Sequence, residues 1–347
     1  MEASPTERRT MARALTLAAQ APVPPGPNPR VGCVIIDPLG RILGEGVHLG
    51  AGTPHAEVFA LAEAGQSAWG STVIVTLEPC AHTGLTGPCT QALIDAGVRR
   101  VVFAQADPHV VAAGGAEVLR QAGIDVVGGV FEAEAFALNR HWSGAMRLGR
   151  PFVTWKVAMT LDGRIAAGDG TSRWVSSAPA RRDAHRLRAR CDTIVAGTNT
   201  VAVDNPDLTI RDDFDQPLDH QPARVIVGDR ELSKELKVFS GDAPAEQLRG
   251  HDPVATLDRL FEAGSRHVLL EGGPTLAAAF WQAGVIDEVV AYVAPMLLGD
   301  GAQAIASLGI GTIADAVLLE VREVTTVGEG SEANVRITLV PRRAEAE

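Results

Sequence analysis

The stretch Thr76-Leu-Glu-Pro-Cys-Ala-His-Thr-Gly-Leu-Thr-Gly-Pro-Cys89 and, upstream of it, Thr53-Pro-His-Ala-Glu57 decide the fold of the first half of the chain. They contain one imidazole and two thiols, the ligand types that zinc prefers. Three protein ligands leave a fourth position for water, which is typical of a catalytic zinc site rather than a structural one. We therefore expect His55, Cys80 and Cys89 to bind one Zn²⁺ per chain.

Glu57 is the predicted catalytic residue of this site. It follows His55 by two positions near the start of a predicted helix, so its carboxylate can shuttle a proton without binding the metal. Cys89 falls in the first turn of another predicted helix, where the dipole favours a thiolate. His82 is an alternative ligand, although a loop residue there is expected to face a substrate. Polar turns and two core cysteines are the simpler alternative, which the combined motifs disfavour.

Composition limits the function classes. The chain has 347 residues, 31 Lys+Arg against 42 Asp+Glu, a net charge of −11 and 46% hydrophobic residues. This acidic balance argues against nucleic-acid and anionic-membrane partners, and no apolar run is long enough for a membrane span. Four cysteines are too few for a disulfide scaffold. We expect a cytoplasmic homo-oligomer, a dimer or tetramer, acting on a small molecule.

Strands and helices alternate along the chain, which predicts an α/β fold. Helices are expected over 6–20, 55–64, 88–96 and 116–122, with Thr53 as N-cap of the second, and strands over 31–37, 41–47, 72–77, 101–104 and 124–127. The pattern breaks near 138–152, so we expect two domains, 1–147 and 148–347. The second domain is predicted to have strands over 152–158, 193–196, 224–227, 267–271 and 288–293, and a strand-rich end.

The second half lacks a G-x-G-x-x-G fingerprint but has a glycine turn after a predicted strand. In Glu271-Gly-Gly-Pro-Thr-Leu276, the glycines would let the backbone approach a phosphate at the start of a helix. A plain strand-to-helix turn is the alternative. Arg188 and Arg211 are candidates to hold a phosphorylated substrate, although both could be solvated charges.

The zinc motifs resemble those of the zinc-dependent nucleoside and nucleobase deaminases, whose pattern is H-x-E followed by P-C-x-x-C. Here eight residues separate the cysteines, as in the deaminase half of the bifunctional riboflavin-biosynthesis enzymes, and Asn28-Pro-Arg-Val-Gly-Cys-Val34 and Asp107-Pro108 extend the match. The chain departs from that family at Leu85, Gly87 and His109, all in loops expected to contact substrate.

This resemblance covers roughly residues 10 to 340 and implies the whole architecture. A cytidine-deaminase-like three-layer α/β/α domain would precede a dihydrofolate-reductase-like α/β domain that uses NADPH. The implied NADPH contacts are Ala158, Trp174, Thr200, Asp204, Gly273, Pro274, Thr275, Leu276, Ala277, Ala278 and Ala279. The implied substrate contacts are Ser172, Arg188, Leu208, Arg211 and Glu271. Gly228 stands where some relatives have a serine that contacts NADPH, and Lys156 matches a family lysine to which we assign no role.

The implied activity is hydrolytic deamination of 2,5-diamino-6-ribosylamino-4(3H)-pyrimidinone 5′-phosphate, followed by NADPH-dependent reduction of its ribosyl group to ribityl. Two alternatives stay open from the sequence. One is a zinc deaminase acting on another nucleoside or a tRNA base, fused to an unrelated reductase. The other is a zinc-stabilised scaffold without turnover.

Overall fold

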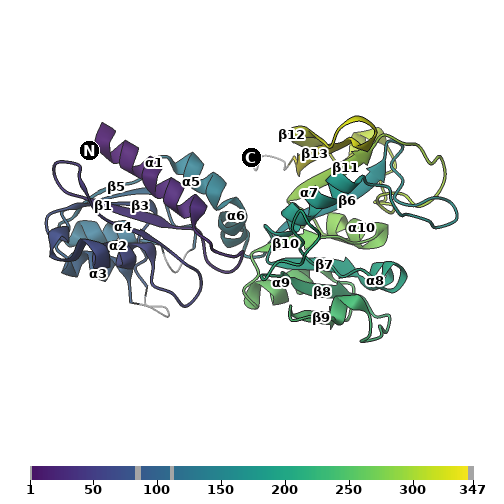
Figure 1. Ribbon diagram of the computed structural model, residues 1–347, viewed down its shortest axis with the longest axis horizontal. Helices are drawn as coiled ribbons and strands as arrows, with labels where there is room; N and C mark the ends of the chain where they lie inside the picture. The colour runs from purple at the N-terminus through teal and green to yellow at the C-terminus, as the bar shows by residue number, and fades with distance from the viewer. Residues whose placement is uncertain (1, 83–86, 110–112, 343–347) are drawn as a thin grey trace. The chain divides into compact units, whose positions relative to one another are not determined.

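The computed structural model describes residues 2–82, 87–109 and 113–342, and the chain forms two compact units, Met1–Gly149 and Arg150–Glu347 (Figure 1). Within the described residues, no helix is both long and apolar enough to cross a membrane.

The first unit is built on a five-stranded sheet with strand order β2-β1-β3-β4-β5. β1 pairs antiparallel with β2 and β3, whereas β3, β4 and β5 are parallel. Its strands are β1 (Gly32–Ile36), β2 (Ile42–Val47), β3 (Thr72–Leu77), β4 (Arg100–Gln105) and β5 (Asp125–Val127), and its helices are α1 (Pro5–Gln20), α2 (Ala56–Ala64), α3 (Cys89–Asp95), α4 (Gly115–Gln121), α5 (Glu132–Leu138) and α6 (Arg140–Leu148).

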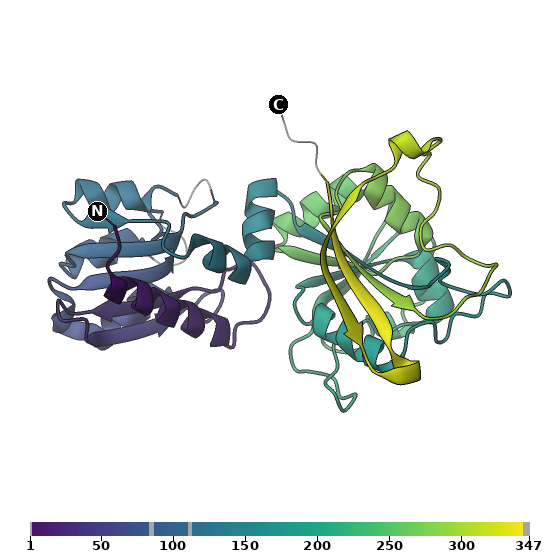
Figure 2. The same cartoon turned by 90° about the horizontal axis from the view of Figure 1, so that it is seen from above.

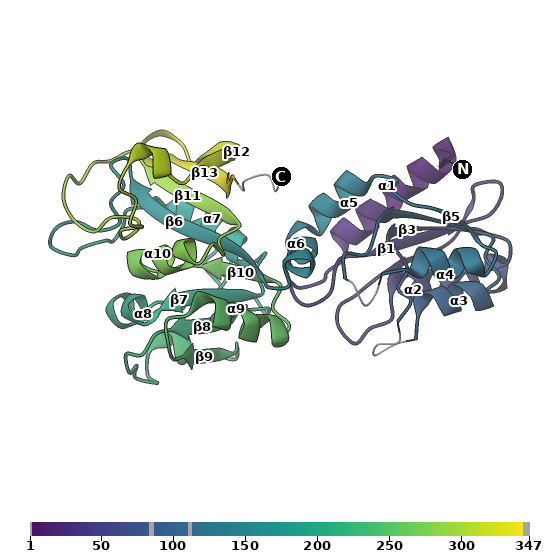
Figure 3. The same cartoon turned by 180° about the vertical axis from the view of Figure 1, so that it is seen from behind.

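Helices cover both faces of this sheet, so the predicted three-layer α/β/α arrangement is confirmed. α1 and α5 lie on one face, where Met11 and Ala135 pack with Val34 and Ile74. α2, α3 and α4 lie on the other, around a core that contains Cys33 (Figures 1 and 3). Alternate residues of β1 and β3 point into the two cores, which is why both strands are apolar throughout.

The second unit contains an eight-stranded sheet with order β12-β13-β11-β6-β10-β7-β8-β9. The six strands from β11 to β9 are parallel, and β13 and β12 continue the sheet antiparallel. The strands are β6 (Phe152–Thr160), β7 (Thr193–Gly197), β8 (Ala223–Val227), β9 (Ala245–Leu248), β10 (His267–Leu270), β11 (Glu288–Ala294), β12 (Leu319–Val327) and β13 (Asn334–Pro341), and the helices are α7 (Ala178–Arg188), α8 (Thr198–Asp204), α9 (Pro253–Glu262) and α10 (Pro274–Gln282).

Here too the helices lie on both sheet faces. α9 and α10 bury residues such as Leu257 and Phe280 against one face, and α7 and α8 pack Ala184 and Val201 against the other. The β12–β13 hairpin runs as a long ribbon along one margin of this unit (Figure 2). The parallel strands bring the ends of β10, β7 and β8 to one edge, where the predicted coenzyme and substrate residues begin.

One detail of the sequence prediction is wrong. α2 starts at Ala56 with His55 at its N-cap, so Thr53 is not the capping residue. The Thr53 hydroxyl instead donates to the carbonyl of Gly50, and the Pro54 carbonyl contacts His48 Nδ1. These contacts hold Thr53 and Pro54 in the preceding turn. Because α2 begins one residue later than predicted, His55 lies at its N-cap.

Candidate functional site

His55, Cys80 and Cys89 converge from three elements of the first unit. His55 caps α2, Cys80 follows β3, and Cys89 is the first residue of α3. The Nδ1 atom of His55 lies 3.1 Å from Cys89 Sγ and 3.6 Å from Cys80 Sγ. All three ligand atoms lie within 4.8 Å of one another.

This triangle fits zinc. With Zn–S near 2.3 Å and Zn–N near 2.0–2.1 Å, tetrahedral geometry places a nitrogen and a sulfur ligand about 3.6 Å apart. The two observed N–S separations lie at or a little inside that value. The ligand set is one imidazole and two buried thiols, with His55 presenting its Nδ1 atom rather than Nε2. His55, Cys80 and Cys89 would therefore hold the ion.

The surroundings favour a thiolate at Cys80. Hydrogen bonds from Cys89 and His55 lower the pKa of the Cys80 thiol to about 4, although its burial acts in the opposite direction. The backbone N–H of Cys89 also points at Cys80 Sγ, at 3.4 Å. A deprotonated sulfur is the form that binds a metal ion.

Glu57 lies beside the ligand triangle in the first turn of α2. Only 3% of its surface is exposed. Burial raises the pKa of the Glu57 carboxyl. The predicted neighbour of the metal ligands is thus a carboxylate shielded from bulk water.

Glu78 and Gly115 position the loop that carries Cys80. The Glu78 carboxylate accepts the backbone N–H groups of Ala116, at 2.8 Å, and Asp107, at 3.2 Å. At Gly115 an added Cβ would lie 1.8 Å from the Pro79 carbonyl oxygen, so only glycine lets α4 approach so closely. The Gly114-Gly115 pair was the sequence signal for this close contact, and our sequence analysis missed it.

A second histidine, His48, also escaped the sequence analysis. Its Nε2 atom lies 2.8 Å from the Asn28 side-chain nitrogen, and its ring meets the His55 ring edge-on at a centroid distance of 5.4 Å. Burial lowers the pKa of His48, which favours the neutral ring. The Asn28 loop therefore contacts the metal ligand His55 indirectly, through His48.

That loop is held in place by Arg30 and Asn139. The guanidinium of Arg30 donates to the carbonyls of Ala19, Ala21 and Val23. The Asn139 amide binds both the backbone N–H and the carbonyl of Arg30. The proline-rich segment 21–29 is thus fixed by side chains rather than by regular structure.

The other predicted loop residues have mixed outcomes. His82 is not among the three residues that form the metal cluster, and its ring lies 6.5 Å from the His109 ring. The backbone N–H of His109 donates to Asp107, whose pKa burial raises to about 6. Gly87 is exposed, and Leu85 lies outside the described residues.

In the second unit, Lys156, Arg188 and Glu271 form a buried cluster. Glu271 follows β10, Arg188 ends α7, and Lys156 lies on β6. The Arg188 guanidinium binds both Glu271 oxygens, at 2.5 and 3.0 Å, and Lys156 Nζ lies 3.7 Å from the same carboxylate. Arg188 also donates to the carbonyl of Thr209. Three of its donor groups are therefore already engaged.

The charges of these three side chains shift one another's pKa values. Burial acts to raise the pKa of Glu271, but the charges of Arg188 and Lys156 lower it to about 2. Burial lowers the pKa of the Lys156 amine, against the opposing pull of Glu271. One carboxylate and two cations leave a formal charge of +1 at the end of the central strands.

A second group of predicted residues surrounds the glycine turn before α10. An added Cβ at Gly273 would lie 3.5 Å from the Thr200 hydroxyl, and one at Gly197 would lie 3.8 Å from Leu276. The turn and the start of α8 are thus in contact. Ala277 and Ala278 are buried in the core, at 0% and 5% exposure, whereas the other residues of the predicted run 273–279 are half-buried or exposed.

The remaining predicted residues lie at the same end of the sheet or near it. Trp174 is 63% exposed and stacks under Arg181, and the Arg173 guanidinium next to it donates to the carbonyl of Asp204. Leu208 has a left-handed backbone, φ 52°, which is uncommon for a residue with a side chain. Ala158 lies on β6 and packs at the α7 face, Ser172 is half-buried, and Arg211 is bonded to Asp207 and Asp215.

Comparison with known proteins identifies both halves. The family model "RibD C-terminal domain" matches residues 151–332, and "Cytidine and deoxycytidylate deaminase zinc-binding region" matches 4–105. The riboflavin biosynthesis protein RibD of Mycobacterium tuberculosis H37Rv is 47% identical over 303 residues, covering 87% of this chain and 89% of that one. The chain belongs to the RibD family.

Other RibD proteins extend this match over nearly the whole chain. The Escherichia coli K12 RibD is 40% identical over 352 residues, covering 92% of this chain and 96% of that one. The solved structure of Acinetobacter baumannii RibD superposes with a TM-score of 0.87 at 37% identity, covering 97% and 99% of the two chains. A Thermotoga maritima structure, named as a diaminohydroxyphosphoribosylaminopyrimidine deaminase/5-amino-6-(5-phosphoribosylamino)uracil reductase, gives 0.83 at 31% identity, covering 97% and 99%.

RibD membership settles the class of both sites. The chain is a bifunctional enzyme of riboflavin biosynthesis, with a zinc-binding deaminase half and an NADPH-dependent reductase half of the RibD type. The expected cytidine-deaminase-like and dihydrofolate-reductase-like folds are confirmed. The alternatives of an unrelated reductase partner and of a scaffold without turnover are not favoured.

Proposed function

We propose that residues 1–147 deaminate 2,5-diamino-6-ribosylamino-4(3H)-pyrimidinone 5′-phosphate and that residues 148–347 then reduce its ribosyl group, giving 5-amino-6-(5-phosphoribitylamino)uracil. The observation that carries the proposal is the convergence of His55, Cys80 and Cys89 beside a buried Glu57, in a chain whose relatives bear these activities in their names. Because the chain as a whole is negatively charged, a phosphorylated pyrimidine would bind where cationic side chains gather.

In the deaminase half, Glu57 is the proton carrier. When bound, zinc supplies the Lewis acidity that makes water a nucleophile near neutral pH. Glu57 takes a proton from that water and delivers it to the departing amine, and its burial in the first turn of α2 keeps bulk water from competing. The neutral His48 ring fixes the Asn28 loop against the metal ligand His55.

In the reductase half, Glu271 and its cationic partners hold the sugar phosphate end of the substrate. When bound, NADPH supplies the hydride. The +1 charge of the Lys156, Arg188 and Glu271 cluster attracts the anionic substrate to the end of β10. Arg188 keeps the Glu271 carboxylate ionised and oriented, and Arg211 remains the candidate for direct phosphate contact, together with Ser172 and Leu208 as further substrate contacts.

We place NADPH along the outer edge of the same strands. The proposed contacts are Ala158, Trp174, Thr200, Asp204 and, of the run from Gly273 to Ala279, the residues outside the core. The contact between Thr200 and Gly273 supports this placement, because it leaves a glycine backbone at the start of α10 open to a phosphate.

Glu57→Gln tests the deaminase assignment. We expect ammonia release to fall by roughly 100- to 10,000-fold, with one zinc per chain retained and the reductase rate on the deaminated substrate unchanged. Glu63→Gln on the exposed side of the same helix is the matched control and should keep both activities. Ammonia release within a few-fold of the parent enzyme would remove Glu57 from the chemistry.

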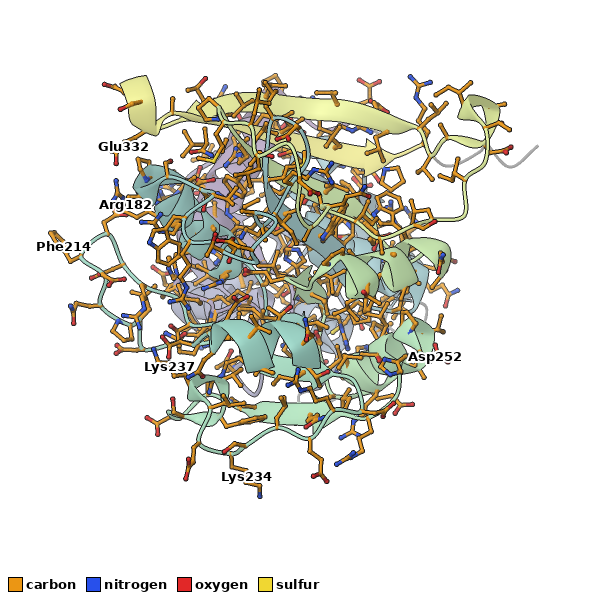
Figure 4. All side chains as sticks on the ribbon, turned by 90° about the vertical axis from the view of Figure 1, so that its right-hand side faces the viewer. Arg182, Phe214, Lys234, Lys237, Asp252 and Glu332 are labelled. Carbon is orange, nitrogen blue, oxygen red and sulfur yellow. The ribbon has the colours of Figure 1, made fainter. Side chains whose placement is uncertain are left out.

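We also propose that the chain forms a homo-oligomer through the β12–β13 hairpin. The hairpin lies at the outer margin of this unit (Figure 4). On one face of it Val321 pairs with Leu339 and Val324 with Ile337. Leu339 packs against the core beneath α10, whereas the two valines of β12 are exposed. Val321 is 56% and Val324 61% exposed. Because each copy carries a charge of −11, contact through an uncharged face avoids repulsion between copies.

Sedimentation of Val324→Lys measures this association. We expect monomers, since a lysine at the centre of a two-fold contact meets its own copy. Val254→Lys, on the exposed side of α9, is the control and should sediment as the parent protein does. An oligomer unchanged by Val324→Lys would rule out this face. We place the enzyme in the cytoplasm, where free thiols such as these stay reduced.

A further inference from the structure

Polar contacts that no part of the proposed mechanism uses attach α7 to the β12–β13 hairpin. The carboxylate of Asp183, at the middle of the helix, accepts hydrogen bonds from the Arg336 guanidinium of β13, at 3.1 Å, and from the Tyr292 hydroxyl of β11, at 2.7 Å. The same helix ends at Arg188, the partner of Glu271. Resting on the proposed role of the Glu271 cluster in binding substrate, we infer that Arg336 is a positioning residue of the reductase, which holds α7 so that Arg188 meets Glu271.

Apolar packing alone holds α7 weakly. Only Ala180 and Ala184 of this helix are buried, and they pack against Val290 and Tyr292 of β11 (Figure 1). An alanine side chain removes little apolar area from water, so these two residues contribute little to fixing the helix on the sheet. Polar contacts to the neighbouring strands therefore set its position.

The ion pair between Asp183 and Arg336 is fixed on both sides. Asp183 is the only acidic residue of a helix that has four arginines, yet its cationic partner lies on β13. Both side chains are largely buried, and Arg336 also donates to Glu323 of β12, at 2.8 Å. Burial and the neighbouring Asp183 carboxylate raise the pKa of Tyr292, so its hydroxyl stays a donor to that carboxylate. The contact thus joins α7 to three strands.

The helix can transmit this contact to the substrate cluster. Asp183 and Arg188 are five residues apart, about 140° around the helix axis, so they lie on opposite flanks. The backbone N–H of the N-cap residue Ser177 donates to the Asn334 side chain at 3.1 Å, which ties the other end of α7 to β13. A helix of roughly three turns moves as a rigid body. Because a bidentate contact weakens steeply when its geometry changes, a shift of α7 would loosen the bonds from Arg188 to Glu271.

Steady-state kinetics of the full zinc-loaded chain measure the inference. We expect Arg336→Met to raise the KM for the deaminated substrate roughly 5- to 50-fold, with kcat lowered less than about 3-fold and the KM for NADPH within about 2-fold of the parent. A general loss of structure would change all three values. Arg336→Lys should lie between the two, because an ammonium group restores the charge beside Asp183 without the fork that also binds Glu323. Arg322→Met, at an exposed residue of β12, is the matched control and should keep all three values.

A double-mutant cycle shows whether Arg336 acts through Arg188. In an Arg188→Lys background, Arg336→Met should change the substrate KM by less than about 2-fold, since the bidentate contact that it supports is already lost. An unchanged KM in Arg336→Met, or the same fold-increase in both backgrounds, overturns the inference. Asp183→Asn removes the ion pair without altering the hairpin itself, and it should raise the KM as Arg336→Met does.

Two further variants complete the test. Tyr292→Phe removes one hydroxyl without leaving a charge unpaired and should raise the substrate KM roughly 2- to 5-fold. If the ion-pair variants do not fold, an unchanged KM in Tyr292→Phe overturns the inference. Arg188→Lys alone tests the proposed role of the cluster: if it raises the KM and Arg336→Met does not, only the inference fails. If Arg188→Lys leaves the KM unchanged, the role of the cluster and the inference fail together.

Discussion

Glu271→Gln should destabilise the second unit, because it leaves two buried cations without their carboxylate. The Glu271 side chain is 8% exposed and its partner Arg188 16%, and the pair is bidentate at 2.5 and 3.0 Å. Removing one member of such a buried pair costs about 3–5 kcal/mol. The pKa of Glu271 gives the same scale: the fall from 4.5 to about 2 corresponds to about 3 kcal/mol.

The contribution of Glu271 to the free energy of unfolding decreases as the pH falls. Because the pKa of Glu271 is lower in the folded chain than in the unfolded one, its contribution is fully present above pH about 4.5. The contribution is lost as the pH falls toward 2. We therefore expect the free energy of unfolding of the second unit to drop across this range in the parent and to be flatter in Glu271→Gln.

The assay must follow the second unit alone, since acid also protonates the Cys80 thiolate of the first. Trp155 and Trp281 pack edge-on in the core of the second unit, with ring centroids 6.2 Å apart. With Trp69 and Trp142 of the first unit replaced by phenylalanine in parent and variant alike, near-ultraviolet circular dichroism in urea reports on the second unit. Glu262→Gln, an exposed carboxylate at the end of α9, is the control. An unfolding free energy of Glu271→Gln within 0.5 kcal/mol of the parent, roughly the scatter of surface changes, would refute the reasoning.

Two further predictions concern the first unit. Gly115→Ala should lower its stability by about 1–3 kcal/mol and weaken zinc binding, because the new Cβ would meet the Pro79 carbonyl oxygen at 1.8 Å, whereas Gly87→Ala has nothing within 4 Å and should be neutral. Zinc content and thermal melts measure both. Removing zinc with a chelator should lower the melting temperature of the first unit and leave that of the second unchanged, since the three ligands come from separate elements of one unit.

The metal centre could be predicted from sequence because its ligands and its carboxylate lie in short motifs. His55 and Glu57 lie at one helix start, and each cysteine follows a proline at an element boundary, so the motifs identify the four side chains before their convergence is known. The contacts that fix these motifs could not be predicted in the same way. Asn139 binds Arg30 across 109 residues of sequence, and nothing near either residue indicates its partner.

Short elements were also missed, for a physical reason. β9, Ala245–Leu248, has the sequence Ala-Glu-Gln-Leu, without β-branched or aromatic residues, and is a strand because it pairs with β8 at the sheet edge. α5 and α6 lie in and just before the segment that the sequence indicated only as a break in the alternation of strands and helices. In each case tertiary contacts decide the structure, and local propensity does not.

Both sites nevertheless obey one rule, which explains why sequence places them well. In each unit some of the site residues follow parallel strands: Cys80 after β3 and Asp107 after β4 in the first, and Glu271 after β10 and Gly228 after β8 in the second. Parallel strands bring their carboxyl ends to one edge of the sheet, so the topology alone brings residues that are far apart in sequence close together.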